Sequence, residues 1–291
     1  MPLQNVIALL FDCDDTLCSD TTEFLLGEYG VKIEEFWSDV GRMVGWGWDP
    51  PLAYMTLLIE RVQYGEIPDL TTEKLRDIGR KIRFFPGVPR VFEDLRKFVK
   101  SESAFREAGV SLEYYVVSGG LEELIRGSVI APHMTDIFGC TFSTERRTGL
   151  VSWPQSIVTF TEKTKFVFAI NKGIPGSILR RSPYRVNDAI SKDERRIPFQ
   201  NMIYVGDGPS DIPCFSLIRS LGGHGVGVYK KGGAKKGYQL ARGNRTTVGP
   251  YRCDYRNGHD LRNALEQIVA QIGLEIVEKN RIRTVSAPTH S

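Results

Sequence analysis

The chain has 291 residues, of which 41% are hydrophobic and 25% are charged, so it is a globular chain long enough to bury a core of its own. Its 38 lysines and arginines exceed its 35 aspartates and glutamates by only three, which excludes bulk charge attraction to nucleic acid or to an anionic membrane. The N-terminal apolar run has no basic stretch before it and ends in acids, so neither a secretion signal nor a membrane anchor is expected, and a cytoplasmic location follows by default.

The first expected strand covers residues 6–11, six consecutive apolar residues that are followed by three acids. A run of this length without polar alternation indicates a central strand of a parallel sheet, and ligands of such sheets bind at the carboxyl ends of the strands. Because side chains two residues apart share a face, Asp12 and Asp14 point to the same side, where their like charges need a cation or a shared proton. The alternative is that Asp14, Asp15 and Thr16 cap a following helix or turn.

The cysteines are odd in number and lack the C-x-x-C spacing that is typical of zinc or redox sites. We therefore expect reduced thiols in a reducing compartment. Cys13 lies between the two acids, as a nucleophile would, but strand alternation turns its side chain away from them, so we expect a structural role. The five cysteines are Cys13, Cys18, Cys140, Cys214 and Cys253.

Residues 21–83 carry apolar side chains at helical spacing, which predicts a helical insert. Its middle, residues 45–51, contains glycines and prolines that break a helix and is expected to display Trp46 and Trp48 on a flexible loop. Both indoles are candidate ligand contacts. The alternative is that they pack the insert against the core, because tryptophan is usually mostly buried.

The second expected strand, residues 114–117, ends at Ser118, Gly119 and Gly120, and a helical stretch follows at 121–125. Backbone amides that are exposed at a helix N-terminus favour an anion, and the serine adds a small hydroxyl group.

Residues 137–160 contain two short β-like runs around a polar turn, which predicts a hairpin or an irregular excursion. The helix that begins near residue 161 carries Lys163 in its first turn, where a cation opposes the helix dipole, and an anion nearby would explain this placement. Lys165 is the competing candidate. The largely polar residues 175–200 show no clear period and are expected to form a surface insertion.

The third expected strand, residues 202–205, runs into the segment Gly-Asp-Gly-Pro-Ser-Asp at 206–211. The glycines let the backbone turn sharply beside Asp207, and Asp211 opens the next helix. Further along the chain we expect a short strand at 226–228 and a closing helix at 261–272.

Together these segments make the chain resemble the haloacid dehalogenase-like (HAD) hydrolase superfamily. The four motifs of that superfamily occur in order, as D-x-D-x-T at 12–16, Ser118, Lys163 and G-D-x-x-x-D at 206–211. One such motif alone is a weak signal, but four with matching strand and helix contexts are specific. The resemblance implies an α/β fold, in which a Rossmann-like parallel sheet lies between helices and a small helical cap domain is inserted after the first strand.

The resemblance also implies catalytic roles. Asp12 attacks phosphorus to form an aspartyl-phosphate, and Asp14 protonates the leaving-group oxygen and then deprotonates the hydrolytic water. By the same resemblance, Mg²⁺ is held by Asp12, the backbone carbonyl of Asp14 and Asp207, while Asp211 orients these ligands.

The remaining phosphoryl oxygens are assigned by the resemblance to Ser118, the amides of Gly119 and Gly120, and Lys163, which neutralise the charge of the transition state. Thr16 is expected to fix the loop around the phosphate.

The insert occupies the cap position of capped superfamily members. The expected division is a core of residues 1–19 and 84–275, a helical cap of residues 20–83 and a flexible tail at 276–291. The resemblance narrows to the phosphoserine-phosphatase-like branch, whose Ser-Gly-Gly and Gly-Asp-Gly segments are present. Thr21 and Ile59 stand nearest the positions of that branch's substrate-reading acid and cap arginine, so the resemblance does not extend to phosphoserine as the substrate.

The sequence therefore predicts a magnesium-dependent phosphatase whose partner is a small phosphate ester, with no nucleic acid or membrane partner. Two alternatives stay open, a phosphotransferase or phosphomutase that uses the same site, and a non-catalytic binding or regulatory protein that keeps the fold. We place substrate choice on residues 45–54, where Trp46, Trp48 and Tyr54 can stack on an apolar or ring-bearing leaving group.

Overall fold

The computed structural model describes residues 4–242 and 245–285. Its strands are β1 (Val6–Phe11), β2 (Ser111–Leu121), β3 (Asp136–Thr144), β4 (Val151–Ser156), β5 (Met202–Gly206), β6 (His224–Tyr229) and β7 (Val248–Arg252). Within the described residues they form one seven-stranded sheet in the order β4-β3-β2-β1-β5-β6-β7. Neighbouring strands are parallel except for β3 and β4, which form the predicted hairpin. The fold is α/β, as the sequence predicts.

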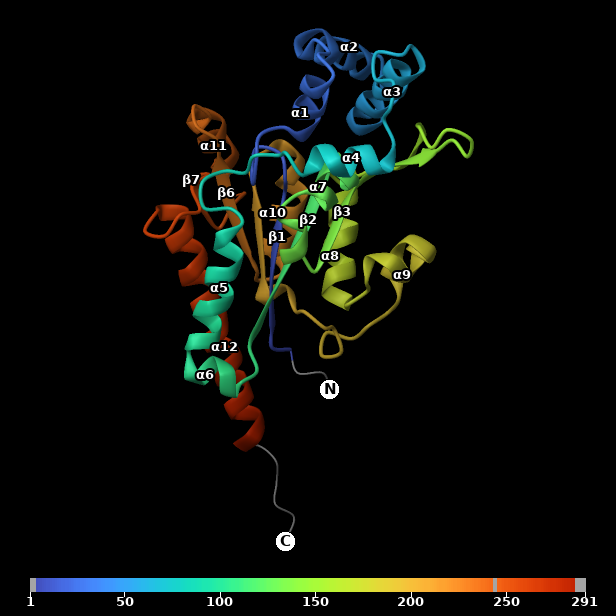
Figure 1. The fold of residues 1–291 in the computed structure, drawn as a ribbon. Coiled ribbons are helices and arrows are strands. Elements are labelled where there is room, and N and C mark those ends of the chain that lie inside the picture. Colours follow the sequence, from blue (N-terminus) through green and yellow to red (C-terminus); the bar gives the residue numbers. More distant parts are fainter. Residues whose placement is uncertain (1–3, 243–244, 286–291) are drawn as a thin grey trace.

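Helices cover the sheet and extend beyond its carboxyl edge. They are α1 (Thr21–Glu28), α2 (Ile33–Gly45), α3 (Pro50–Gln63), α4 (Thr72–Gly79), α5 (Arg90–Ser101), α6 (Ser103–Glu107), α7 (Glu122–Gly127), α8 (Glu162–Lys172), α9 (Gly176–Arg181), α10 (Ile212–Ser220), α11 (Ala234–Ala241) and α12 (Asp260–Val285). Helices α5, α6 and α12 pack together, and α8 packs with α10 (Figure 1). No helix in the described part of the chain combines the length and apolar composition that a bilayer crossing needs.

Strand β1 lies at the centre of the sheet, and all six of its residues are buried. This confirms the interpretation of its apolar run as a strand covered on both faces. The register pairs Phe11, its last residue, with Val116 of β2 and with Val205 of β5. The polar segments that follow these three strands therefore meet at one edge of the sheet.

The insert after β1 comprises helices α1 to α4, and α1 to α3 lie beyond the carboxyl edge of the sheet (Figure 1). Helix α4 instead packs closely on α7. A Cβ atom on Gly79 would lie 2.1 Å from the backbone oxygen of Leu124, and one on Gly127 would lie 2.1 Å from that of Arg76. Because only glycine allows this approach, α4 is fixed to the core, while α1 to α3 have their own position above the sheet.

The closing helix is longer than the sequence analysis predicts. Helix α12 ends at Val285, and Ile276 and Val277 are buried in the core. Residues 276–285 are therefore helical, and the prediction of a flexible tail there is wrong, because the apolar helical period continues beyond residue 272. Residues 286–291, the rest of that predicted tail, lie outside the described residues.

Two further differences concern strands. Strand β2 continues through Leu121, with a register shift against β3, so the Ser-Gly-Gly segment ends a strand and does not open a helix. Strand β7 was not predicted because Pro250 interrupts its short pattern, which an edge strand tolerates. The expected strand at 226–228 is confirmed as part of β6.

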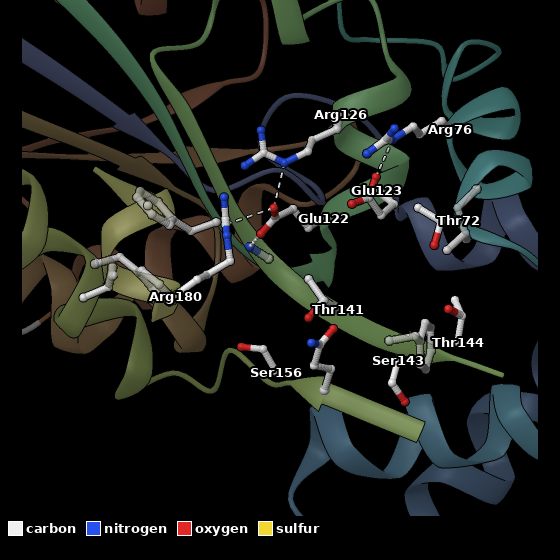
Figure 2. A pocket seen from close by; sticks show the side chains of 18 of the residues that line it. Thr72, Arg76, Glu122, Glu123, Arg126, Thr141, Ser143, Thr144, Ser156 and Arg180 are labelled. Carbon is white, nitrogen blue, oxygen red and sulfur yellow. Dashed lines mark hydrogen bonds and ion pairs between the residues drawn. The ribbon is translucent and has the colours of Figure 1, made fainter. Parts of the chain in front are cut away.

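A cavity of about 1050 Å³ lies between α4, α7, α9 and the β3–β4 hairpin (Figure 2). Its arginines are held by carboxylates. Glu122 accepts hydrogen bonds from Arg126 Nε at 2.6 Å and from Arg180 Nη1 at 3.2 Å, and Arg76 Nε pairs with Glu123 at 2.5 Å. Glu122 thus joins α7 to α9, which belongs to the predicted surface insertion.

Glu122→Gln is expected to lower the free energy of unfolding by about 2 kcal/mol, because the buried carboxylate accepts bonds from two guanidinium groups. Glu123→Gln is the matched control, since the side chain of its partner Arg76 is 49% exposed and such a pair contributes at most about 1 kcal/mol. Urea unfolding of both variants measures the difference. Equal losses would show that Glu122 is not the main link between α7 and α9.

Candidate active site

A cavity of about 310 Å³ lies at the carboxyl edge of the sheet, where β1, β2 and β5 end. The structure brings together here most of the residues that the sequence assigns to chemistry: Asp12, Asp14, Gly119, Gly120, Lys163 and Asp207. The cavity is also lined by residues that the sequence analysis did not assign to a site, among them Asp20, Trp37, Ser210 and Lys236.

Lys163 is the cation at the base of this cavity. It lies in the first turn of α8 and is 1% exposed, and its Nζ is 3.1 Å from Asp12 Oδ1 and 2.7 Å from Asp211 Oδ1. Burial alone lowers the pKa of a lysine, but the two aspartates raise the pKa of Lys163 above its ordinary value, so it stays charged. Lys165 pairs instead with Glu162 of the same helix. The structure therefore selects Lys163 of the two candidates.

Asp211 is fully buried and positions its neighbours. Its Oδ1 accepts hydrogen bonds from Lys163 and from the hydroxyl of Tyr204 at 2.8 Å, and its Oδ2 accepts one from the amide of Gly208 at 3.1 Å. A Cβ on Gly206 would lie 2.5 Å from this carboxyl group, so glycine is required there. The sequence analysis treats Tyr204 only as a strand residue, although a buried tyrosine hydroxyl usually needs a partner.

Asp14 faces the cavity beside Asp12. Its Oδ1 accepts a hydrogen bond from the amide of Thr21 at 2.7 Å, which anchors it to the start of the insert. Gly120 approaches its other side, where a Cβ would lie 2.6 Å from Asp14 Oδ2. Both aspartates of the first motif therefore line one cavity, as strand alternation predicts.

Thr16 supports the loop from below and is fully buried. Its backbone oxygen accepts a hydrogen bond from the hydroxyl of Tyr255 at 2.9 Å, and Asp15 takes a positive φ of 56°, which aspartate tolerates in a turn. Ser118 is also fully buried, and its Oγ accepts a hydrogen bond from the amide of Gly120 at 3.0 Å. Neither Thr16 nor Ser118 lines the cavity, although the sequence analysis assigns both to substrate binding. Both residues shape the loops around the cavity.

Of the three aromatic residues predicted to contact the leaving group, the structure brings only Tyr54 to the cavity. Trp37 of α2 and Tyr54 of α3 line it, and the Tyr54 hydroxyl donates to the backbone oxygen of Gly119 at 2.9 Å. The structure does not bring Trp46 or Trp48 to the cavity, and Trp46 is 78% exposed. Trp46 follows Trp37 by nine residues, or about 14 Å along a helix axis, which takes it away from the sheet edge.

Carboxylates dominate the charge of the site. Ligand oxygens of Asp12, Asp207 and Asp211 lie within 4.8 Å of one another. Burial raises the pKa of Asp12 well above its ordinary value, and nearby aspartates add to this effect against the opposing charge of Lys163. Burial also raises the pKa of Asp207 to about 6, although it pairs with Lys236 at 2.9 Å. Clustered hard oxygen ligands with excess negative charge fit a divalent cation.

Comparison with known proteins identifies the fold. No family model matches the sequence. The chain is 29% identical over 285 residues to an uncharacterized protein of Borreliella burgdorferi, covering 89% of this chain and 95% of that protein. The structure of the present chain matches that of a probable phosphoserine phosphatase from Vibrio cholerae with a TM-score of 0.50 and 14% identity. The match covers 96% of this chain and 68% of that one. The protein has the HAD-like fold.

A second solved structure, a HAD family hydrolase from Salmonella enterica subsp. enterica serovar Typhi, matches with a TM-score of 0.47 and 14% identity. That match covers 78% of this chain but 62% of the hydrolase, so the chain spans less than two thirds of its length. Similarity to solved structures at 14% identity carries no conclusion about activity, and the chemistry has to be argued from the cavity.

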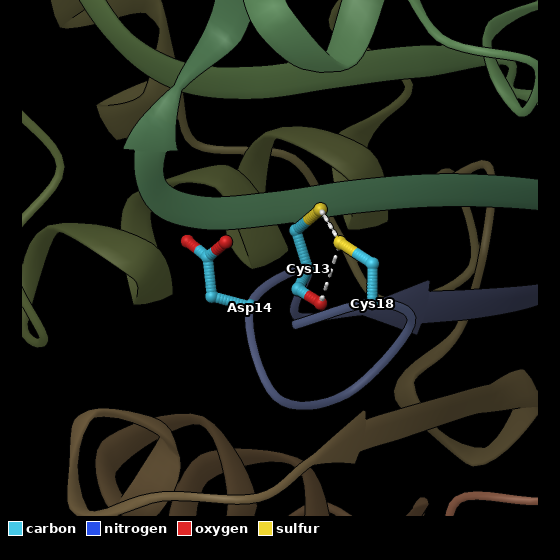
Figure 3. Close-up of side chains that lie close together, drawn as sticks. All are labelled: Cys13, Asp14 and Cys18. Carbon is cyan, nitrogen blue, oxygen red and sulfur yellow. Dashed lines mark hydrogen bonds between the residues drawn. The ribbon is translucent and has the colours of Figure 1, made fainter. Parts of the chain in front are cut away.

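The cysteine beside the two aspartates is not placed as a nucleophile. Cys13 and Cys18 are buried thiols whose sulfur atoms face each other at 3.7 Å, and a carboxylate oxygen of Asp14 lies within 4.8 Å of both (Figure 3). The contact with Cys18, together with burial, raises the pKa of the Cys13 thiol well above its ordinary value. This confirms the structural role that the sequence predicts for Cys13 within the HAD-like fold.

Cys13→Ala is therefore expected to keep any activity of the HAD-like site within about threefold and to lower the free energy of unfolding by about 1 kcal/mol, through the lost packing of a small buried side chain. Steady-state turnover and urea unfolding of the same preparation test the two statements. A loss of more than a hundredfold in turnover by a variant that still folds would assign chemistry to the thiol.

Asp20 is a site residue that caps the insert's first helix, with Oδ1 accepting from the amide of Glu23 at 2.9 Å. Burial, with the charge of Asp14, raises its pKa from 3.8 to about 7. The folded chain thus holds this proton more tightly than the unfolded chain. The contribution of protonated Asp20 to the free energy of unfolding is complete below about pH 4 and is lost as pH rises through about 7.

Asp20→Asn is expected to flatten the dependence of unfolding free energy on pH between 4 and 8, measured by urea unfolding in the presence of a chelator. Asparagine keeps an oxygen acceptor for the Glu23 amide but carries no titrating proton. The variant should therefore gain stability relative to the wild type as pH rises. Parallel curves for the two proteins would contradict the assignment.

Proposed function

We propose that this protein is a phosphatase that hydrolyses the phosphate ester of a small metabolite through an aspartyl-phosphate on Asp12. The observation that carries the proposal is the convergence of Asp12, Asp14, Lys163 and Asp207 in one cavity of about 310 Å³. These residues come from distant parts of the chain, and they supply a nucleophile, an acid–base group, an anion-binding cation and a metal ligand.

The nucleophile is a carboxylate oxygen of Asp12. Its Oδ1 accepts a hydrogen bond from the amide of Cys13 at 2.8 Å and pairs with Lys163, which orients Oδ2 for attack on phosphorus. As the new oxygen–phosphorus bond forms, the ester bond breaks and Asp14 gives its proton to the leaving oxygen. Asp14 then takes a proton from water, which attacks the same phosphorus, releases phosphate and regenerates Asp12.

The carboxylate cluster supports Mg²⁺ as the cofactor. Asp12 and Asp207 would hold the ion together with the backbone carbonyl of Asp14, while Asp211 keeps these groups in place through its bonds to Lys163 and the Gly208 amide. Bound there, the ion supplies positive charge that lets an anionic nucleophile meet an anionic ester. Lys163 and the amide of Gly119 bind the remaining phosphoryl oxygens, while the amide of Gly120 is held by Ser118 Oγ at 3.0 Å.

The insert acts as a cap in this proposal. Its two ends lie side by side, since Cys18 bridges to Phe84 and the amide of Phe85 donates to the oxygen of Leu17 at 2.8 Å. Helices α2 and α3 bring Trp37 and Tyr54 over the cavity, where they cover the leaving group. We also infer a reducing compartment such as the cytoplasm, because all five cysteines are free thiols, including the neighbouring Cys13 and Cys18.

Asp12→Asn is expected to lower phosphate release by at least about a thousandfold, because an amide cannot form the aspartyl-phosphate, and Asp14→Asn by about a hundred- to ten-thousandfold. Release is measured on a broad panel of phosphate esters with Mg²⁺ present, beside circular dichroism of each variant. A chelator should abolish release and added Mg²⁺ should restore it. An Asp12→Asn protein with wild-type turnover would refute the mechanism, and faster transfer to added alcohols than to water would indicate a phosphotransferase.

A further inference from the structure

Lys236 is a cation of the cavity that the proposed chemistry does not use. It lies on α11, its Nζ is 2.9 Å from Asp207 Oδ2, and its side chain is 54% exposed. Lys163 already serves the phosphoryl group from the buried base of the cavity. Lys236 is therefore a second lysine of this cavity, and it is partly exposed.

Lys236 and Ser210 lie on either side of the same small space beside Gly208. Gly208 has no side chain, and a Cβ built on it would lie 3.8 Å from Ser210 Oγ and 3.9 Å from both Lys236 Nζ and Asp211 Oδ2. An ammonium group and a hydroxyl group therefore border one small space at the cavity wall. Such a pair of donors suits a phosphate or carboxylate oxygen.

The segment that contains Lys236 is rich in cations. Residues 230–236 include four lysines, and Lys230 pairs with Asp15 at 2.8 Å, which offsets one of the five aspartates that line the cavity. Stabilisation of the fold explains Lys236 poorly, because an ion pair with an exposed lysine contributes only about 0 to 1 kcal/mol.

We propose that Lys236, assisted by Ser210, binds a second anionic group on the leaving group. The substrates are then small phosphate esters that carry a further phosphate or a carboxylate. The proposal rests on the proposed phosphatase function and narrows its substrate class. The cavity of about 310 Å³ restricts the leaving group to a small molecule, whose body lies against Trp37 and Tyr54 of the same cavity.

The test compares esters that differ in the second anion. Fructose 1,6-bisphosphate is set against fructose 6-phosphate, and 3-phosphoglycerate against glycerol 3-phosphate, so that one pair reports a phosphate and the other a carboxylate. Lys236→Gln should lower kcat/KM about ten- to a hundredfold for the two-anion member of at least one pair, mainly through KM, and leave the one-anion member within about twofold. Lys236→Arg should recover part of the loss.

Lys235→Gln is the matched control, because it removes the same charge from the adjacent, exposed position of α11, which does not line the cavity. It should leave both members of each pair within about twofold. If Lys236 served only to hold Asp207, Lys236→Gln would change all four substrates equally and would shift the Mg²⁺ concentration needed for half-maximal activity. That result overturns the inference and leaves the phosphatase proposal standing.

Calorimetric binding to Asp12→Asn protein separates the inference from turnover. The same two-anion and one-anion ligands are titrated into Asp12→Asn and into Asp12→Asn with Lys236→Gln. A preference for the two-anion ligand that disappears with Lys236 supports the subsite. No such preference, or one that persists without Lys236, overturns it. Absence of turnover on every ester by the wild type would instead overturn the phosphatase function.

Discussion

The close approach of buried carboxylates is the constraint around which the sheet edge is built. Asp12, Asp207 and Asp211 hold ligand oxygens within 4.8 Å of one another, and none of the three residues is more than 8% exposed. Lys163 pairs with two of them, and Tyr204 donates to Asp211 from within the sheet. A buried ion pair often costs as much free energy in desolvation as its attraction returns, so stability alone does not explain such a cluster. The cluster of carboxylates is better explained as a group that binds a cation.

The parts of the site that follow strands could be predicted from the sequence, because simple geometry determines them. Side chains alternate along a strand, and parallel strands end at a common edge, so Asp12, Asp14 and Asp207 had to meet once their apolar runs were recognised as neighbouring strands. The choice between Lys163 and Lys165 was harder. Both lie in the first turn of α8, and only the packing of that helix decides which ammonium group is buried.

Apart from Tyr54, the walls of the cavity could not be predicted, since they depend on where separate elements pack. The stretch 45–51 looked like one long loop with two displayed indoles, but α2 continues to Gly45 and α3 begins at Pro50, so the indole that faces the cavity is Trp37, eight residues before α2 ends. Lys236 comes from α11, far along the chain, with no motif around it. Its place beside Asp207 follows from the pairing of β6 with β5, a long-range fact that local patterns do not contain.

The groups proposed for the reaction and the groups that face the leaving group lie on different elements of the fold. The groups proposed for chemistry sit on strand ends whose backbone is fixed by the sheet, and glycines at positions 120 and 206 leave no room to shift Asp14 or Asp211. The groups that face a leaving group sit on α2, α3 and α11, outside the sheet. Helix α4, fixed on α7 through Gly79 and Gly127, keeps the insert attached to the core while α1 to α3 form the wall. Changes in those helices can therefore alter which ester fits without disturbing the carboxylates that act on phosphorus.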